Sequence, residues 1–250
     1  MARRRAKMEM DQMPAGAFGR YWGATHAPLN GLVFIAPFLV LYEVGVAGWG
    51  TDLLARTDLQ KFLQQFGASA AHLSAVLVAA VLLAWQAVGR RRWKVDGSAV
   101  GLMYLESLVL ALPLLGLSLI CGRMSATAIA DPTVLLQPSL AQALLGSVGA
   151  GVYEEFLFRL VALNLLGLVL LDALKLNEDL GQIGAVVISA VLFSLYHPQV
   201  LAPWQWGKFF FFFAAGCYLA FIYMGRGFGL AVGAHIFYDV LVAWLQHHSG

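Results

Sequence analysis

The stretch that decides the fold is residues 99–121, AVGLMYLESLVLALPLLGLSLIC, in which Glu106 is the only charged side chain. A helix needs about 20 apolar residues to cross the hydrocarbon core of a bilayer, so this run predicts a transmembrane helix. Similar runs occupy residues 28–49, 70–89, 181–198, 206–224 and 229–246. The sequence therefore predicts an all-α, polytopic membrane protein.

A further apolar run, from Ser139 to Leu171, is too long for one upright helix. It fits either one strongly tilted helix or a span joined to a half-span near Gly149–Gly151, which gives seven or eight transmembrane helices in total. Only 12% of the chain is charged, against about 25% in soluble domains. This composition argues against a soluble all-α protein with a large core.

We expect one membrane-embedded domain over residues 28–250, preceded by a basic leader over residues 1–27. Residues 3–7 and residues 90–94 hold the two dense clusters of Lys and Arg. Two predicted spans separate these clusters, so both face the same side, and basic loops favour the cytoplasm. The prediction is a cell-membrane protein with a cytoplasmic N-terminus. The mixed polar and apolar stretch from Thr51 to Gly67 predicts an interfacial helix.

Besides His72 and Lys208, each the third residue of its span, the predicted spans contain five carboxylates, two histidines and one strong cation. Each charge within a membrane costs about 2.5–3.5 kcal/mol on insertion scales, and one arginine cannot neutralise five acids. Several acids must therefore be protonated, hydrogen-bonded or exposed to a water-filled cavity, which predicts a functional site. The residues are Glu43, Glu106, Glu154, Glu155, Asp239, His197, His235 and Arg159.

The densest motif is residues 153–159, YEEFLFR. Glu155 and Arg159 are four residues apart, so they share a helix face and can pair. Glu154 lies about 100° round the helix and lacks that partner, which suits a general base. The simpler interpretation is that these three residues form only a structural ion cluster.

The two histidines follow in later spans. His197 precedes Pro198, which disfavours helix for the residue before it, so His197 should close its helix. His235 and Asp239 are spaced i, i+4 and share a face. If residues 206–224 form one span, the helices that carry His197 and His235 run parallel. At a rise of 1.5 Å per residue, the two side chains would then differ in depth by about 15 Å.

The order E-E-x-x-x-R, then F-x-x-x-H, then H-x-x-x-D resembles the CPBP family, also called ABI or CAAX-processing endopeptidases. The resemblance covers Leu140 to Asp239, within a motif-bearing half at about residues 139–246. These multi-pass membrane proteases include eukaryotic members that cleave prenylated CAAX tails.

By this resemblance, Glu154 activates the attacking water, with Glu155 and Arg159 completing its motif. His197 and His235 match the two site histidines. Asp239 stands where many members have asparagine, whose amide donates to the oxyanion.

The resemblance implies an intramembrane endopeptidase that hydrolyses a bond near the C-terminus, or in a membrane-associated segment, of a protein substrate. The substrate is a membrane-associated protein or peptide, with lipidation allowed, and no nucleic acid is expected. The required base, water and oxyanion donors are all supplied without a cofactor. The alternative is a divalent metal such as zinc, bound by Glu154, His197 and His235, although the chain has no HExxH motif.

Two other classes remain open on the residues alone. A non-catalytic membrane scaffold or immunity factor needs no chemistry, and a proton-coupled transporter also uses buried acids and histidines. No inverted repeat of the kind found in many carriers is visible.

The other polar and aromatic residues of the spans have less certain places. Glu43 and Glu106 are expected either to pair with Arg159, to support the cavity or to reach the membrane interface. Lys208, Arg226, Trp204 and Trp206 are predicted interfacial anchors. The aromatic run Phe209–Phe213 is predicted to face lipid.

Overall fold

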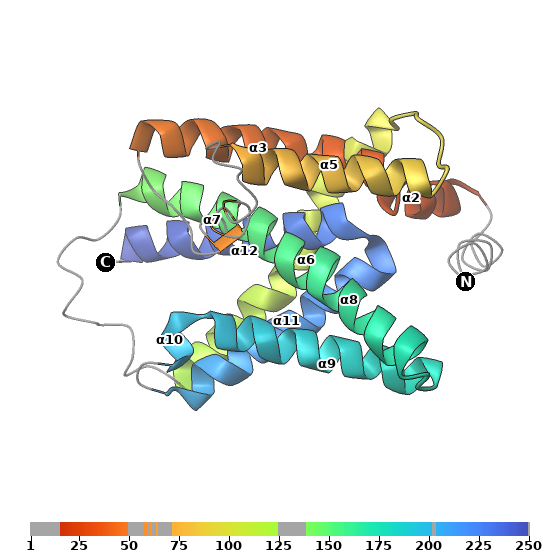
Figure 1. The fold of residues 1–250 in the computed structure, drawn as a ribbon. Helices are drawn as coiled ribbons and strands as arrows, with labels where there is room; N and C mark the ends of the chain where they lie inside the picture. The colour runs from red at the N-terminus through yellow and green to blue at the C-terminus, as the bar shows by residue number, and fades with distance from the viewer. Residues whose placement is uncertain are drawn as a thin grey trace.

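A computed structural model describes residues 16–49, 58–59, 61, 64, 72–124, 139–201 and 204–249 (Figure 1). All the elements in these ranges are helices. They are α2 (Ala17–Thr25), α3 (Pro28–Trp49), α5 (Leu73–Val88), α6 (Gly97–Met124), α7 (Leu140–Glu155), the π-helix η1 (Phe156–Leu163), α8 (Asn164–Gly167), the π-helix η2 (Leu168–Ala173), α9 (Glu178–Tyr196), α10 (Pro198–Leu201), α11 (Trp206–Arg226) and α12 (Phe228–Ser249).

Within the described ranges, six helices are long and apolar enough to cross a membrane. They cover Pro28–Gly48, Gly97–Cys121, Leu140–Ala173, Glu178–Tyr196, Trp206–Arg226 and Phe228–His248. The predicted all-α polytopic membrane protein is confirmed. The predicted span at 70–89 corresponds to α5, an apolar helix of 16 residues. The predicted interfacial helix at 51–67 lies outside the described residues, except for positions 58, 59, 61 and 64.

The long apolar run after Ser139 forms one continuous helical path from Leu140 to Ala173. The alternative of a span joined to a half-span near Gly149–Gly151 is therefore wrong. Glycine weakens a helix by only about 1 kcal/mol, and here these small residues face another helix closely. The described residues thus hold six candidate spans and the shorter apolar helix α5, and a total of seven spans stays a prediction.

Side chains at the helix starts explain several boundaries. Ser139 and Gln142 form a capping box at the start of α7. Each side chain accepts a hydrogen bond from the backbone N–H of the other residue. The Asn177 side chain accepts a hydrogen bond of 2.8 Å from the Leu180 N–H at the start of α9. Before α6, the hydrogen bond from the Ser98 hydroxyl lowers the pKa of the Asp96 carboxyl.

The path from α7 to η2 joins two groups of helices. In Figure 1, α3 and α5 lie side by side at the top, with α7 and α12 next to them and α9 with α11 below. The helix α7 packs against α12 and α3, whereas η1, α8 and η2 pack against α9. The residues at the junction of α7 and η1 are therefore placed between the two groups.

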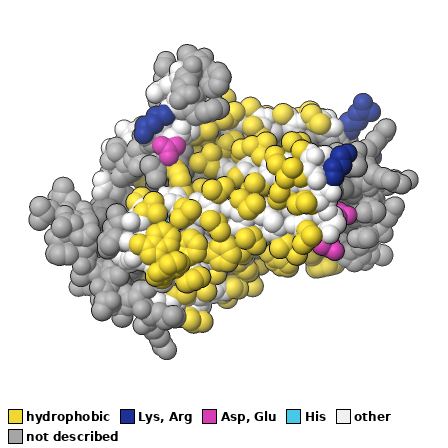
Figure 2. Space-filling model, turned by 60° about the horizontal axis from the view of Figure 1, so that its bottom comes forward, with side chains coloured by type: hydrophobic (Ala, Val, Ile, Leu, Met, Phe, Trp, Pro, Cys, Tyr) yellow, Lys and Arg dark blue, Asp and Glu magenta, His cyan; other side chains and the backbone are white. Residues whose placement is uncertain are grey.

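The outer surface is apolar over a broad face. Figure 2 shows hydrophobic side chains across the middle of this face and charged side chains toward its two ends. On α9, Leu180, Ile183 and Leu192 are among the exposed hydrophobic residues. An apolar belt with charges at its margins is the surface expected of a helical protein in a bilayer.

The loop after α5 lies beside the start of α3. The Arg91 guanidinium donates to the His26 carbonyl at 3.0 Å. The Gln86 side chain accepts from the Leu29 N–H at 3.3 Å. The cluster of basic residues at 90–94 thus lies at the same end of the molecule as the beginning of the first span.

The closest approach between α7 and α12 occurs at Gly151. A Cβ added to this residue would lie 2.4 Å from Cγ1 and 2.9 Å from the backbone nitrogen of Ile236. Because backbone cannot move aside as a flexible side chain does, Gly151 is required for this packing. Ile236 adjoins His235, so the contact also sets the position of a predicted site residue.

We therefore expect Gly151→Ala to destabilise the fold by about 1–3 kcal/mol, as overpacking does. Thermal unfolding in a fixed detergent measures the effect. The control is Gly146→Ala on the same helix, where an added Cβ meets no described atom within 4 Å. Equal unfolding temperatures for the two variants would contradict the close packing.

Candidate active site

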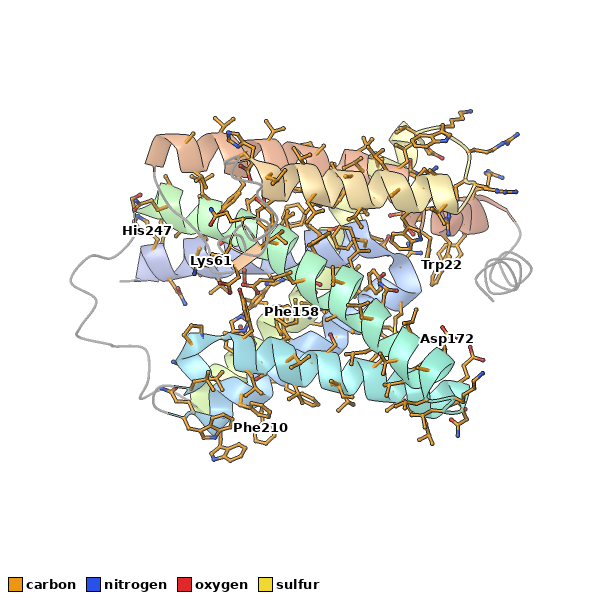
Figure 3. The ribbon with its side chains drawn as sticks, in the orientation of Figure 1. Trp22, Lys61, Phe158, Asp172, Phe210 and His247 are labelled. Carbon is orange, nitrogen blue, oxygen red and sulfur yellow. The ribbon has the colours of Figure 1, made fainter. Side chains whose placement is uncertain are left out.

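The site begins with two glutamates at the end of α7. Glu155 is completely buried, whereas the Glu154 side chain retains 15% exposure. They point in different directions because consecutive helical residues lie about 100° apart. Each carboxylate consequently meets a different histidine. The surrounding core includes Phe158, labelled at the centre of Figure 3.

Glu155 is the centre of a buried ion cluster. Its Oε2 lies 3.1 Å from the Arg159 Nε, the pair predicted from their spacing. Its Oε1 lies 2.8 Å from the His235 Nδ1. The Arg159 guanidinium also donates to the Gly216 carbonyl at 3.3 Å and lies 4.3 Å above the Phe193 ring. Glu155 and Arg159 therefore connect η1 with α9, α11 and α12.

Glu154 faces His197. The distance from Glu154 Oε2 to His197 Nε2 is 3.6 Å. The His197 Nδ1 lies 2.8 Å from the Phe193 carbonyl, and a carbonyl oxygen can only accept, so Nδ1 carries a proton. The neutral imidazole then presents its unprotonated Nε2 to Glu154. As predicted from Pro198, His197 ends α9 in an extended conformation.

His235 lies between two carboxylates. Its Nδ1 faces Glu155, and its Nε2 lies 3.4 Å from the Asp239 Oδ2. Glu155 forms the shorter contact, so it is the residue that orients the imidazole. This link was not predicted from the sequence, where only Asp239 shares a helix with His235.

The predicted difference of about 15 Å in depth between the two histidines is wrong. Residues 206–226 do form one helix, α11. However, the rings of His197 and His235 both pack against Phe193, with centroid distances of 4.8 and 6.1 Å. Because both rings meet at this one side chain, distance along the two helices does not give their separation in depth.

Glu43 does not pair with Arg159, which was one of the predicted alternatives. Its Oε2 lies 2.7 Å from the His72 Nδ1. Its Oε1 accepts a hydrogen bond from the Tyr153 hydroxyl. The Glu43 carboxylate thus stabilises the packing of α3 against α7, on the residue that precedes Glu154.

Glu106 also has a partner other than Arg159. Both of its oxygens bond Arg226, at 2.7 Å each, and Oε2 accepts from the Tyr21 hydroxyl at 2.6 Å. Burial, together with Glu106, raises the pKa of Tyr21. Arg226 additionally lies 4.2 Å over the Trp22 ring. Arg226 ends the span Trp206–Arg226 and forms a bidentate ion pair there, and its role as an interfacial anchor stays a prediction.

The aromatic run 209–213 does not face lipid uniformly. Phe210 is 56% exposed and points away from the helices in Figure 3, as predicted. Phe212 instead stacks on His197, with centroids 3.7 Å apart and planes at 19°. The sequence could have indicated that Phe212 is turned inward, since Phe212 and Gly216 are four residues apart and share a helix face. Gly216 packs closely on Ala190 of α9, so Phe212 shares the buried face.

The three predicted motifs therefore meet in one place. Glu154, Glu155 and Arg159 come from the path of α7 and η1, His197 from the end of α9, and His235 and Asp239 from α12. Residues 136–241, which include all six, match the family model of type II CAAX prenyl endopeptidase Rce1-like proteins.

Over residues 136–241, the chain is similar to the Rce1-like family.

The predicted resemblance to CAAX-processing endopeptidases is thereby confirmed. This similarity supports a membrane protease of the CAAX endopeptidase type. Neither a curated protein nor a solved structure matches the chain.

Because the ion cluster is buried, substitutions of Glu155 and Glu154 should differ in their effect on stability. Removing one partner of a buried ion pair destabilises a protein by about 3–5 kcal/mol. Glu155→Gln should therefore lower the unfolding temperature in detergent strongly, because it leaves Arg159 without its carboxylate. Glu154→Gln is the matched control, with no arginine partner to lose. A Glu155→Gln protein as stable as the control would contradict the proposed importance of the pair.

Proposed function

We propose that this protein is an intramembrane endopeptidase in which Glu154 is the general base for the attacking water. The observation that carries the proposal is the opposition of Glu154 and His197 across 3.6 Å. This distance exceeds the 2.7–3.2 Å of a direct hydrogen bond, but a water can bridge such a pair. Of the five intramembrane acids, Glu154 is also one of the two without an arginine or tyrosine partner among the described residues.

The protonation of His197 orients that water. In the neutral imidazole that we propose, Nδ1 donates to the Phe193 carbonyl and Nε2 therefore accepts. A water between Nε2 and a Glu154 carboxylate donates one hydrogen to each and turns its lone pairs toward the substrate. Glu154 takes the proton as the water oxygen bonds the peptide carbon, and the proton then passes to the leaving amine as the C–N bond breaks.

His235 and Asp239 form the proposed oxyanion side. Glu155 bonds Nδ1 of His235 and so directs Nε2 toward Asp239. A protonated Asp239 donates a hydrogen bond, as the asparagine of many family members does. Donors held at the position where negative charge develops stabilise the transition state.

The residues fit a metal poorly. Among the described residues, no three His, Cys, Asp or Glu side chains are arranged to hold a metal ion. Both ring nitrogens of His235, the third ligand of the zinc alternative, already face carboxylates. We therefore propose a glutamate-type reaction, and no step requires a cofactor.

The proposed substrate is a membrane-associated protein or peptide that is cleaved near its C-terminus or in a membrane-associated segment. The site lies within apolar helices, so the substrate must enter from the bilayer or its surface.

We also propose a cell-membrane location with the N-terminus in the cytoplasm. This is supported by the basic residues at 90–94, which lie at the same end as the start of α3.

Glu154→Gln should lower cleavage at least about 10²–10⁴-fold, the usual contribution of a general base, while the protein stays folded. Cleavage is measured in liposomes with quenched-fluorescence peptides, farnesylated and unmodified.

Exhaustive chelation should leave wild-type activity intact, and elemental analysis should find well under one metal per chain. Wild-type turnover by Glu154→Gln would exclude the assignment, and zinc content that follows activity would favour the metal alternative.

Asp239→Asn tests the oxyanion side. The amide of asparagine is a hydrogen-bond donor, so Asp239→Asn should keep or raise activity. Glu155 already orients His235, so loss of the Asp239 carboxylate should not disturb the imidazole. A pH–rate profile decides the matter, and a mutant that is inactive at every pH would exclude the donor role.

A further inference from the structure

The helix changes its hydrogen-bonding pattern immediately after the two glutamates. α7 ends at Glu155, and residues Phe156–Leu163 form the π-helix η1, which contains Arg159. π-Helices account for well under 1% of residues and occur mostly as single turns at functional sites. The pair Glu155–Arg159 thus spans a junction between two helical geometries, so the geometry of η1 determines where Arg159 points.

Two side chains donate hydrogen bonds to three consecutive carbonyls of η1. The buried Ser189 hydroxyl, from α9, donates to the Phe158 carbonyl at 2.9 Å. The Asn164 amide donates to the Leu160 carbonyl at 2.7 Å and to the Arg159 carbonyl at 3.2 Å. Side chains that bond helical carbonyls change the local course of a helix. These donors therefore stabilise the wide turn that holds Arg159.

A third helix fixes the Asn164 amide. Its nitrogen also lies 2.6 Å from the hydroxyl of Tyr223, which is buried on α11. Both carbonyls and the hydroxyl surround the same amide atom, and the carbonyls can only accept. That atom must therefore be the nitrogen rather than the oxygen. Asn164 is exposed on the helix surface, yet its donors point back to the backbone, where lipid offers no alternative partner.

The side chain of Arg159 depends on this turn. Its guanidinium must reach Glu155, the Gly216 carbonyl and the face of Phe193 together. An ordinary α-helical turn after Glu155 would rotate Arg159 relative to these three partners. Glu155, without the cation in place, would no longer hold His235 in one orientation.

We propose that Asn164 and Ser189 are positioning residues, whose hydrogen bonds to the π-helix carbonyls direct Arg159 onto Glu155 and so hold His235 in the site. Neither side chain contacts the histidines or Glu154 in the described structure. Their effect on cleavage rests on the proposed function, whereas their effect on His235 does not.

The test is Asn164→Leu, which removes the donors with a side chain of similar size that lipid accepts. Misplacing a catalytic group by about 1 Å costs up to about 100-fold, so kcat should fall about 10- to 100-fold. KM should stay within about threefold, because the loss affects the transition state rather than substrate binding. Asn164→Ser should recover most of the activity, since serine can donate to the carbonyl four residues earlier. Leu165→Ala, at the next exposed position, is the control and should behave as wild type.

A second measurement follows His235 directly. Nitrogen NMR of the histidine-labelled protein reports the Nδ1–H bond to Glu155, with a His235→Gln sample to assign the signal. Asn164→Leu should shift this signal, and Leu165→Ala should not. If wild type cleaves none of the peptides, the proposed function fails, but the NMR signal still decides the positioning role.

Unchanged kcat and an unchanged His235 signal in a folded Asn164→Leu protein would overturn the inference. If that variant does not fold, Ser189→Ala takes its place, with an expected loss of about fivefold in kcat, the equivalent of one neutral hydrogen bond. A Ser189→Ala protein with wild-type kcat and a wild-type His235 signal would then overturn it.

Discussion

The ion pair between Glu155 and Arg159 is the interaction on which the rest of the site depends. Both side chains are removed from solvent, where an unpaired charge would cost several kcal/mol. Each therefore needs every partner that the fold supplies. Arg159 uses the Gly216 carbonyl and the Phe193 ring, and Glu155 uses His235. Satisfying one buried pair thus fixes the relative positions of α9, α11 and α12.

The same need for partners divides the intramembrane acids into two groups. Glu155 and Glu106 each pair with an arginine, and Glu43 bonds a tyrosine and a histidine. Among the described residues, the ionic contacts of Glu154 and Asp239 are with imidazoles, and both carboxylates are partly exposed. Carboxylates with strong partners hold helices together. Those without them are the residues to which we assign proton exchange in the proposed hydrolysis.

The sequence predicted the helices, the Glu155–Arg159 pair and the end of α9 at His197, because each follows from local periodicity or from one proline. It did not predict the bond between Glu155 and His235 or the stacking of Phe212 on His197. These contacts depend on the angles at which helices cross, and no local pattern encodes those angles. For the same reason, the sequence left the places of Glu43 and Glu106 open among three alternatives, of which the pairing with Arg159 is wrong. Each is satisfied by a residue distant in sequence and on another helix.

The helices before residue 136 lie outside the family match, yet they hold the site in place. Gly229 and Gly233 of α12 pack directly against Gly31, Phe34 and Ser107 of α3 and α6. At the start of the same helix, the turn at Gly227 packs on the Thr25 carbonyl with a φ of +92°, a conformation that favours glycine. The bidentate pair of Glu106 with Arg226 ties α6 to the residue before that turn. The helix α12 carries His235 and Asp239. Contacts with the first half of the chain therefore position these two residues of the proposed site.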